Sequence, residues 1–316
     1  AMDPPEHTRL RRLVARSFTN LRVKALRPRV QALVDDMLDE MAAVGPPFDV
    51  VPGIAQQLPI AVICELLGVP TRDGPYFREL AQVILSLTAS TPAQVGAARG
   101  RFSGYLARLA AEKRADPDDD LISDLVRAGD EHEALSMDET ISMARTLLLA
   151  GAHTTANEIA LSCLVLLRRR ERYALLLERP ELLRPAVEEL LRYNSLSNSG
   201  GFLRIAREDV ELGGVTIRAG EAVLPSIVSA NRDATTFADA DEIVLDRPRN
   251  AHLAFGHGLH HCLGAHLARA ELEIAIGSLL RRFPTLHLSE PDGQSDAVGV
   301  DAGQLLRGIP RLLVAW

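Results

Sequence analysis

The chain has 316 residues and 47% hydrophobic content, which suffices for one large domain with a real core and excludes disordered, collagen-like and disulfide-scaffold proteins. Its 42 acidic and 35 basic residues give a net charge of -7, so bulk charge predicts binding neither to nucleic acid nor to an anionic membrane. Three scattered cysteines and an N-terminus without an apolar signal segment predict a cytoplasmic protein.

Residues 3 to 170 are predicted to be mostly helical. Apolar residues recur three and four positions apart in two sets: Leu10, Leu13, Val14 and Phe18, then Val30, Leu33, Val34, Met37, Leu38 and Met41. Asp3 is expected to cap the first helix, with Pro4 and Pro5 in its first turn. The acidic run 116–120 is expected to be a solvated turn before the next helix.

Ser136 and Glu139 form a capping box that opens a helix running to about residue 168, a length of roughly 50 Å. Its stretch 147–167 is apolar enough to suggest a membrane span. However, polar residues interrupt that stretch, among them His153, Asn157 and Glu158, and they would be costly in lipid. A buried helix with polar groups near its middle is therefore predicted.

The second half of the chain mixes helices with short strands. The pattern predicts a helix over 181–193, a hairpin of strands 210–212 and 215–217, and an aperiodic stretch over 230–253. A final helix is expected to bury Ala268, Leu272, Ala275, Ile276, Leu279 and Phe283. The predicted fold is mainly α with small β-sheets (α+β), as one domain over 1–316.

The densest chemical cluster is the segment Phe255–Gly264, in which Cys262 is expected at the start of the final helix. Free amides at a helix N-terminus stabilise a thiolate, and Gly256, Gly258 and Gly264 would let the backbone lie against a planar group. A macrocycle held by one thiolate ligand is the first interpretation.

Two other interpretations of Cys262 stay open. A lone cysteine is ordinarily a buried core thiol, in which case the glycines only form a turn. The cysteine could also join a zinc site with the neighbouring histidines, which are His257, His260, His261 and His266. No Cys-x-x-Cys pair supports that zinc site.

Two weaker motifs lie earlier in the chain. Glu189 and Arg192 are an acid and an arginine three apart on a helix, a pair that is usually a solvated face. In the segment 150–155, Gly151 weakens the long helix, and the hydroxyls of Thr154 and Thr155 can bond carbonyls one turn back. That segment is either a groove or a small-residue packing face.

The three motifs occur along the chain in the order 150–155, 189–192 and 255–264. Together they resemble the cytochrome P450 family, in its soluble bacterial form, and the resemblance extends from Asp3 to Trp316. Phe255-Gly-x-Gly-x-His-x-Cys-x-Gly264 is similar to the haem-binding signature of that family, Glu189 and Arg192 to its characteristic helix pair, and 150–155 to its oxygen-binding groove. The resemblance implies the cytochrome P450 fold and haem b, with Cys262 as the thiolate ligand of the iron.

The resemblance also implies roles around the haem. Thr154, with Thr155 beside it, would steer protons in the groove, and Gly151 would leave room for oxygen. Phe255 would shield the thiolate. The anionic propionates would be paired by His7, Arg11, Arg204 and His260. Away from the haem, a buried structural triad would consist of Glu189, Arg192 and Arg247.

The chain departs from the family pattern in two places. The family usually has an acid before the groove threonine, where this chain has His153. An imidazole, with an ordinary pKa of about 6.5, can still relay protons near neutral pH. In the family, a sequence like residues 3–7 follows an N-terminal sheet and the helices that cover the substrate pocket, so an N-terminally truncated fold is expected. Such a fold would expose apolar surface, which would allow a homodimer.

These inferences predict a haem-thiolate monooxygenase that oxidises, by hydroxylation in the simplest case, a small organic molecule of secondary metabolism with dioxygen. Electrons are expected from an external ferredoxin and ferredoxin reductase docking near Arg11, Arg12 and Arg269. The alternative is a non-catalytic interaction or recruitment module with structural haem or none. Leu147, Leu148, Ala150 and the segment 195–202 are expected to shape the substrate pocket.

Overall fold

The computed structural model describes residues 2–132, 135–194, 196, 201–289 and 306–316. Most of these residues are helical, and the strands form small sheets of two or three strands. The prediction of a mainly α fold with small β-sheets is therefore confirmed. One hydrophobic cluster extends from Leu10 near the N-terminus to Val314 near the C-terminus.

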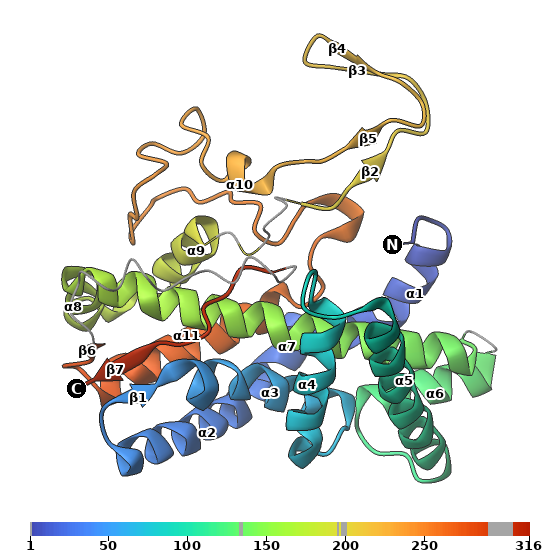
Figure 1. The fold of residues 1–316 in the computed structure, drawn as a ribbon, viewed down its shortest axis with the longest axis horizontal. Helices are drawn as coiled ribbons and strands as arrows, with labels where there is room; N and C mark the ends of the chain where they lie inside the picture. The colour runs from blue at the N-terminus through green and yellow to red at the C-terminus, as the bar shows by residue number, and fades with distance from the viewer. Residues whose placement is uncertain (1, 133–134, 195, 197–200, 290–305) are drawn as a thin grey trace.

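Helix α7 (Met137–Arg168) crosses the whole molecule, and the other helices surround it (Figure 1). It begins with the predicted capping box, in which Ser136 Oγ accepts the Glu139 N–H and the Glu139 carboxylate accepts the Ser136 N–H. Every residue from Glu158 to Leu167 is buried, as expected of a helix that is apolar on all sides. Within the described ranges, no helix combines the length and apolar composition needed to cross a bilayer.

In the described part of the chain, six helices precede α7: α1 (Glu6–Ala15), α2 (Asn20–Val44), α3 (Gln57–Leu67), α4 (Gly74–Leu85), α5 (Pro92–Ala115) and α6 (Leu121–His132). In Figure 1, α2 to α5 lie below α7. α3 and α5 pack directly on α7, whereas α2 packs on the last helix. The predicted apolar face of α2 is buried, with Val34 and Met41 fully covered.

Two sequence predictions in this half are wrong. Asp3 does not cap α1, because the helix begins at Glu6 after Pro5, which leaves Asp3 outside the first turn. Its carbonyl oxygen accepts the His7 N–H. The acidic run 116–120 is a loop, but it is not wholly solvated. Asp120 is buried and pairs with the Lys113 Nζ at 2.6 Å.

Among the described residues, four helices follow α7: α8 (Arg170–Glu178), α9 (Leu183–Tyr193), α10 (Ile227–Ala230) and α11 (Ala265–Arg282). α9 is the helix predicted over 181–193, and a 3-10 turn precedes it at Pro180–Leu182. α11 is the predicted final helix, although Ala268 on its expected buried side is only half-buried.

The strands within the described ranges make three antiparallel sheets. β7 (Leu313–Ala315) lies between β1 (Phe48–Asp49) and β6 (His287–Leu288), so it ties the C-terminus to the first half of the chain. β2 (Arg204–Ile205) pairs with β5 (Ala222–Val223). β3 (Val210–Leu212) and β4 (Val215–Ile217) form the predicted hairpin, whose turn glycines have φ of 59° and 80°, the left-handed values that a two-residue turn requires.

The segment from Asn231 to Gly264 contains no helix or strand except a 3-10 turn at Gly258–His260. In Figure 1 it runs as long loops on the α9 side of the molecule. The aperiodic stretch predicted from the sequence is confirmed. Because so long a segment has few backbone hydrogen bonds of its own, its path must depend on partners elsewhere in the chain.

Candidate active site

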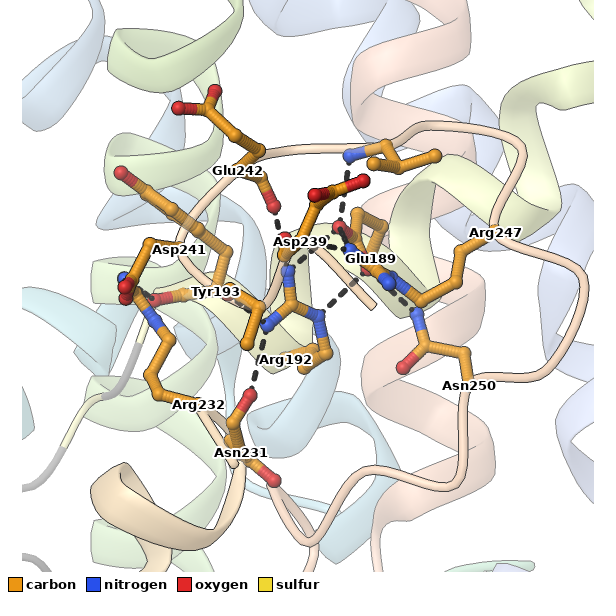
Figure 2. Close-up of polar contacts among 12 residues, drawn as sticks. Glu189, Arg192, Tyr193, Asn231, Arg232, Asp239, Asp241, Glu242, Arg247 and Asn250 are labelled. Carbon is orange, nitrogen blue, oxygen red and sulfur yellow. Dashed lines mark hydrogen bonds and ion pairs between the residues drawn. The ribbon is translucent and has the colours of Figure 1, made fainter. Parts of the chain in front are cut away.

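Glu189, Arg192 and Arg247 meet in a buried network (Figure 2). Glu189 Oε2 accepts from Arg192 Nε at 2.8 Å and from Arg247 Nε at 2.9 Å, and Oε1 accepts from their Nη2 atoms at 2.7 and 3.1 Å. The Val244 N–H and the Asn250 amide also donate to this carboxylate. Burial acts to raise the pKa of Glu189, but these hydrogen bonds and the arginine charges outweigh it and lower the pKa.

The two arginines use their other N–H groups to hold the aperiodic segment. Arg192 donates to the carbonyl oxygens of Asn231, Ala240 and Glu242 at 2.7 to 2.8 Å, and Arg247 donates to that of Ala238. A buried ion pair needs such additional partners to offset the cost of leaving water. Figure 2 shows the loop wrapped around Arg192 in this way.

Cys262 is the accessible thiol of the chain. Its side chain is exposed, whereas Cys64 and Cys163 are buried, and burial raises the pKa of each of those two thiols to about 12. The Cys262 N–H donates to the Phe255 carbonyl oxygen at 2.8 Å, which closes the loop between them. The interpretation of Cys262 as a buried core thiol is therefore wrong.

Opposing effects act on the Cys262 thiol. Surrounding protein atoms displace water and raise its pKa, although the side chain stays accessible. A hydrogen bond from the Gly264 N–H and the charges of Arg11 and Arg269 act in the other direction and stabilise the thiolate. Arg11 Nη2 also donates to the His261 carbonyl oxygen at 2.6 Å, so α1 holds the cysteine loop from the side.

The glycines of the loop leave room beside the thiol. Gly256 and Gly258 have φ of 70° and 74°, in the left-handed region that disfavours a side chain. A Cβ added at Gly258 or at Gly264 would meet no atom within 4 Å. The loop that carries the exposed Cys262 therefore leaves open space at these glycines, which suits a flat ligand.

Three separate segments bring cationic and imidazole groups together next to this loop. The rings of His7 and His260 lie 4.2 Å apart, and His7 Nδ1 is buried with no hydrogen-bond partner. Loss of water lowers the pKa of His260, and the charges of His7, Arg204 and Arg11 lower it further, against an opposite effect of Asp3. A buried nitrogen without a partner among crowded positive charges fits a ligand carboxylate. These residues thus fit the propionates of a haem.

The middle of α7 carries the groove motif. Thr154 Oγ1 donates to the Ala150 carbonyl oxygen at 2.7 Å, and Thr155 is buried. A Cβ added at Gly151 would lie 3.0 Å from Ile63 Cγ1, so this glycine also lets α3 approach α7 closely. The segment therefore combines a backbone-bonded hydroxyl with a close helix contact.

His153 differs from the sequence expectation of an imidazole with an ordinary pKa. Burial, with a further effect of the Arg78 charge on α4, lowers its pKa to about 4. The ring is therefore neutral at pH 7, with one donor and one acceptor nitrogen. No carboxylate among the described residues offsets this influence of Arg78 on the ring.

The structure also bears on the remaining predictions from the sequence. Across the described ranges, no group of three or more His, Cys, Asp or Glu side chains is arranged to hold a metal ion, so nothing supports the zinc interpretation. Of the pocket residues, Leu148 is buried in the core and Leu147 is half-buried. Residues 195 and 197–200 of the expected pocket segment lie outside the described residues.

Sequence reasoning missed two polar networks. In one, Glu158 on α7 accepts from Asn194 Nδ2 at 2.7 Å and from Ser162 Oγ at 3.2 Å, all of them buried. In the other, Glu188 on α9 binds His252 and Arg269. The available signals were a glutamate inside an apolar helix and a glutamate doublet at 188–189, and neither signal indicates the partner.

Known proteins resemble the chain over its full length. A sequence model of the family described as Cytochrome P450 matches residues 176–300. Nocardicin C N-oxygenase of Nocardia uniformis subsp. tsuyamanensis is 50% identical over 316 residues, which cover 100% of this chain and 78% of that protein. Mycinamicin IV hydroxylase/epoxidase of Micromonospora griseorubida is 47% identical, with coverage of 100% and 79%. The crystal structure of HinD with NMFT and NO has a TM-score of 0.95 and 48% identity, with coverage of 100% and 79%.

Proposed function

Because the chain belongs to the cytochrome P450 family and is a monooxygenase of that family, we propose that Cys262 is the axial thiolate ligand of its haem. The observation that carries this proposal is that Cys262 is an exposed residue in a loop where Gly258 and Gly264 leave open space. The alternative of a non-catalytic module is not favoured, because the relatives are named as oxygenases and hydroxylases.

The cofactor is haem, and we propose haem b, held by one domain over 1–316. His7, Arg11, Arg204 and His260 would bind its carboxylates, which fits the His7 nitrogen that has no partner in the protein. Phe255, Gly256, Gly258 and Gly264 would line its cysteine side. When bound, the haem supplies the activation of dioxygen, to which the electron-donating thiolate contributes.

Residues of α7 would manage protons on the opposite side. The Thr154 hydroxyl donates to the Ala150 carbonyl oxygen one turn back, and it would exchange this bond for one in the groove to take part in proton transfer. Thr155 and Gly151 flank it. His153, being neutral at pH 7, would take a proton on one ring nitrogen and release one from the other without holding a charge beside Arg78.

The role of Glu189, Arg192 and Arg247 would be structural. Their hydrogen bonds hold the segment that leads into the cysteine loop, and both arginines bond several of its carbonyl oxygens. The network would thereby help to fix the path of the chain toward Phe255 and Cys262. None of the three side chains is accessible to a substrate.

The substrate would be a small organic molecule, since the names of the relatives include a nocardicin, a mycinamicin and pentalenic acid. Electrons would come from an external ferredoxin and ferredoxin reductase in the cytoplasm. Arg12 is exposed and suits a docking surface, whereas Arg269 is already paired with Glu188. The homodimer stays a prediction, for which the exposed Phe202, Leu203 and Ile205 are the available apolar residues.

An absorption spectrum tests the proposal, recorded on purified protein after haem reconstitution and then after reduction under carbon monoxide. The wild type is expected to show the red-shifted Soret band of thiolate-ligated haem, and Cys262→Ala is expected to lose it. Cys163→Ala is the matched control, because it removes a buried thiol elsewhere and should keep the band. A wild type without any Soret band, or a Cys262→Ala variant with the same band, would overturn the assignment.

A further inference from the structure

Glu188 is adjacent to Glu189 on α9 but points to a different set of partners. Its Oε1 accepts from Arg269 Nε at 2.6 Å and its Oε2 from Arg269 Nη2 at 2.9 Å, a bidentate pair that joins α9 to α11. Burial acts to raise the pKa of Glu188, but the bonds from His252 and Arg269 and the charge of Arg269 lower it to about 2. The carboxylate is therefore charged at neutral pH.

His252 completes the network from the aperiodic segment, and its tautomer follows from its contacts. His252 Nδ1 accepts the Ala254 N–H at 3.2 Å, so the ring proton is on Nε2. Nε2 lies 3.0 Å from Glu188 Oε2 and donates to it. The His252 side chain is only 3% exposed, so this bond is protected from solvent.

Arg269 connects this network to the cysteine loop. Its guanidinium carbon lies 4.5 Å from the centroid of the Phe255 ring, within the range of a cation–π contact. The Phe255 carbonyl oxygen accepts the Cys262 N–H at 2.8 Å. The positive charge is thus held against the residue that closes the loop, and it stabilises negative charge on the Cys262 sulfur.

We propose that Glu188, His252 and Arg269 are positioning residues that set the reduction potential of the haem, with Arg269 as a positive charge behind the Cys262 loop and Glu188 as the group that holds it there. The inference rests on the proposed ligation of haem by Cys262. Reduction adds one negative charge to the iron–thiolate unit, so a nearby positive charge favours the reduced form. Both charged residues act through Cys262 and Phe255, and neither one touches substrate.

The charges predict shifts of opposite sign. Arg269→Leu removes the positive charge and should lower the reduction potential. Glu188→Gln removes the negative charge and should raise it, although both changes break the same ion pair. The double variant Glu188→Gln with Arg269→Leu removes a neutral pair and should return toward the wild-type potential. A merely structural role predicts the same direction for both single variants, because both loosen the same loop.

Spectroelectrochemical titration of the haem-loaded proteins measures these potentials. The matched controls are Arg282→Leu, an exposed arginine on the same helix, and Glu181→Gln, an exposed acid before α9, which should leave the potential unchanged. Arg269→Lys keeps the charge and should stay closer to the wild type than Arg269→Leu. If a single variant does not fold, Arg269→Lys and the double variant still test the proposal, because a shift in both would contradict it.

The outcomes separate this inference from the function on which it rests. A wild type that lacks the thiolate Soret band contradicts the ligation by Cys262, and the proposed network loses its role as well. A wild type that has the band, with single variants that shift in the same direction or no more than the controls, contradicts the network alone.

Discussion

The two sides of the proposed haem site are built by opposite means. α7 is one regular helix whose backbone hydrogen bonds are satisfied within it, and its limits follow from its own capping box and apolar pattern. The segment 231–264 has almost no regular structure, and its carbonyl oxygens bond to Arg192 and Arg247 instead. Polar side chains consequently have different roles in α7 and around the segment 231–264. The arginines beside 231–264 bond backbone that lies far from them in the sequence, whereas Thr154 in the middle of α7 bonds a carbonyl oxygen of its own helix one turn back.

Removal of Arg192 should give the largest effect on stability, because the segment 231–264 depends on side chains from distant parts of the chain. Arg192→Leu leaves Glu189 buried with one arginine and leaves the carbonyl oxygens of Asn231, Ala240 and Glu242 without their donor. Loss of one partner of a buried ion pair costs about 3–5 kcal/mol. Urea denaturation should show this loss in the free energy of unfolding, together with weaker retention of haem.

Arg184→Leu is the matched control for that experiment. The Arg184 side chain is 79% exposed and its Nε lies 3.5 Å from Glu273, so the change should cost less than about 1 kcal/mol. Equal stability losses in the two variants would mean that the segment 231–264 does not depend on the Arg192 network.

The same contrast explains which features the sequence could predict. The helix α7 and the hairpin 210–217 rely on local periodicity, capping and turn glycines, and both were predicted with nearly the observed limits, whereas the last helix begins at Ala265 and not at Cys262. The partners of Glu188 and of His153 were not predicted, because Arg269 and Arg78 lie on other helices. Side-chain contacts between distant elements depend on the packing of those elements, and a pattern in one segment carries no information about it.

Asp120 is a second residue whose environment the sequence pattern did not predict. A run of aspartates is normally solvated, and composition predicted that for the whole run. One member is buried because Lys113 on the preceding helix reaches it, while Asp118 on the same lysine stays largely exposed. Charge pattern alone therefore does not tell a structural acid from a solvated one.

Glu158 tests whether a polar group in α7 can be structural instead. Burial raises its pKa to about 7, in spite of hydrogen bonds from Asn194 and Ser162 that act to lower it. Between the ordinary value of 4.5 and about 7, the unfolded chain loses this proton while the folded protein keeps it. The free energy of unfolding therefore falls as pH rises through that window and stays lower above it. Glu158→Gln should remove the fall, a gain on the order of 3 kcal/mol at pH 7.

Urea denaturation of both proteins from pH 4 to 8 measures this effect as the difference between the two curves. The difference is needed because His153 contributes the opposite slope. Its pKa is lowered to about 4, so the unfolded chain binds the extra proton between pH 4 and its ordinary value of 6.5, and stability rises with pH there. Parallel curves for wild type and Glu158→Gln would show that Glu158 ionises as readily as an exposed glutamate.

Substitution of His153 tests the proposed proton relay on α7. His153→Asp replaces a neutral imidazole by a carboxylate beside Arg78, which would hold its negative charge and accept hydrogen bonds without donating one. We expect the fraction of reductant converted into product to differ from that of the wild type, because the acid–base group of the proposed proton relay has changed. Product formed per reductant consumed is the measurement. His287→Asp, an exposed histidine on β6, is the control, and equal coupling in His153→Asp and wild type would remove His153 from the proton relay.

Gly151 should give the smallest effect, because two contributions of similar size oppose each other. Alanine is a better helix former than glycine by about 1 kcal/mol in the interior of a helix. The added Cβ would lie 3.0 Å from Ile63 Cγ1 and 3.1 Å from Ile63 Cδ1, so α3 must shift slightly to accept it. We expect Gly151→Ala to change the free energy of unfolding by less than about 1 kcal/mol.

A double-mutant cycle with Ile63→Ala separates the two contributions. That substitution removes both contacting carbon atoms, so Gly151→Ala should stabilise the Ile63→Ala background, where only the gain in helix propensity and some filled space remain. A coupling energy near zero would show that α3 does not restrict this position.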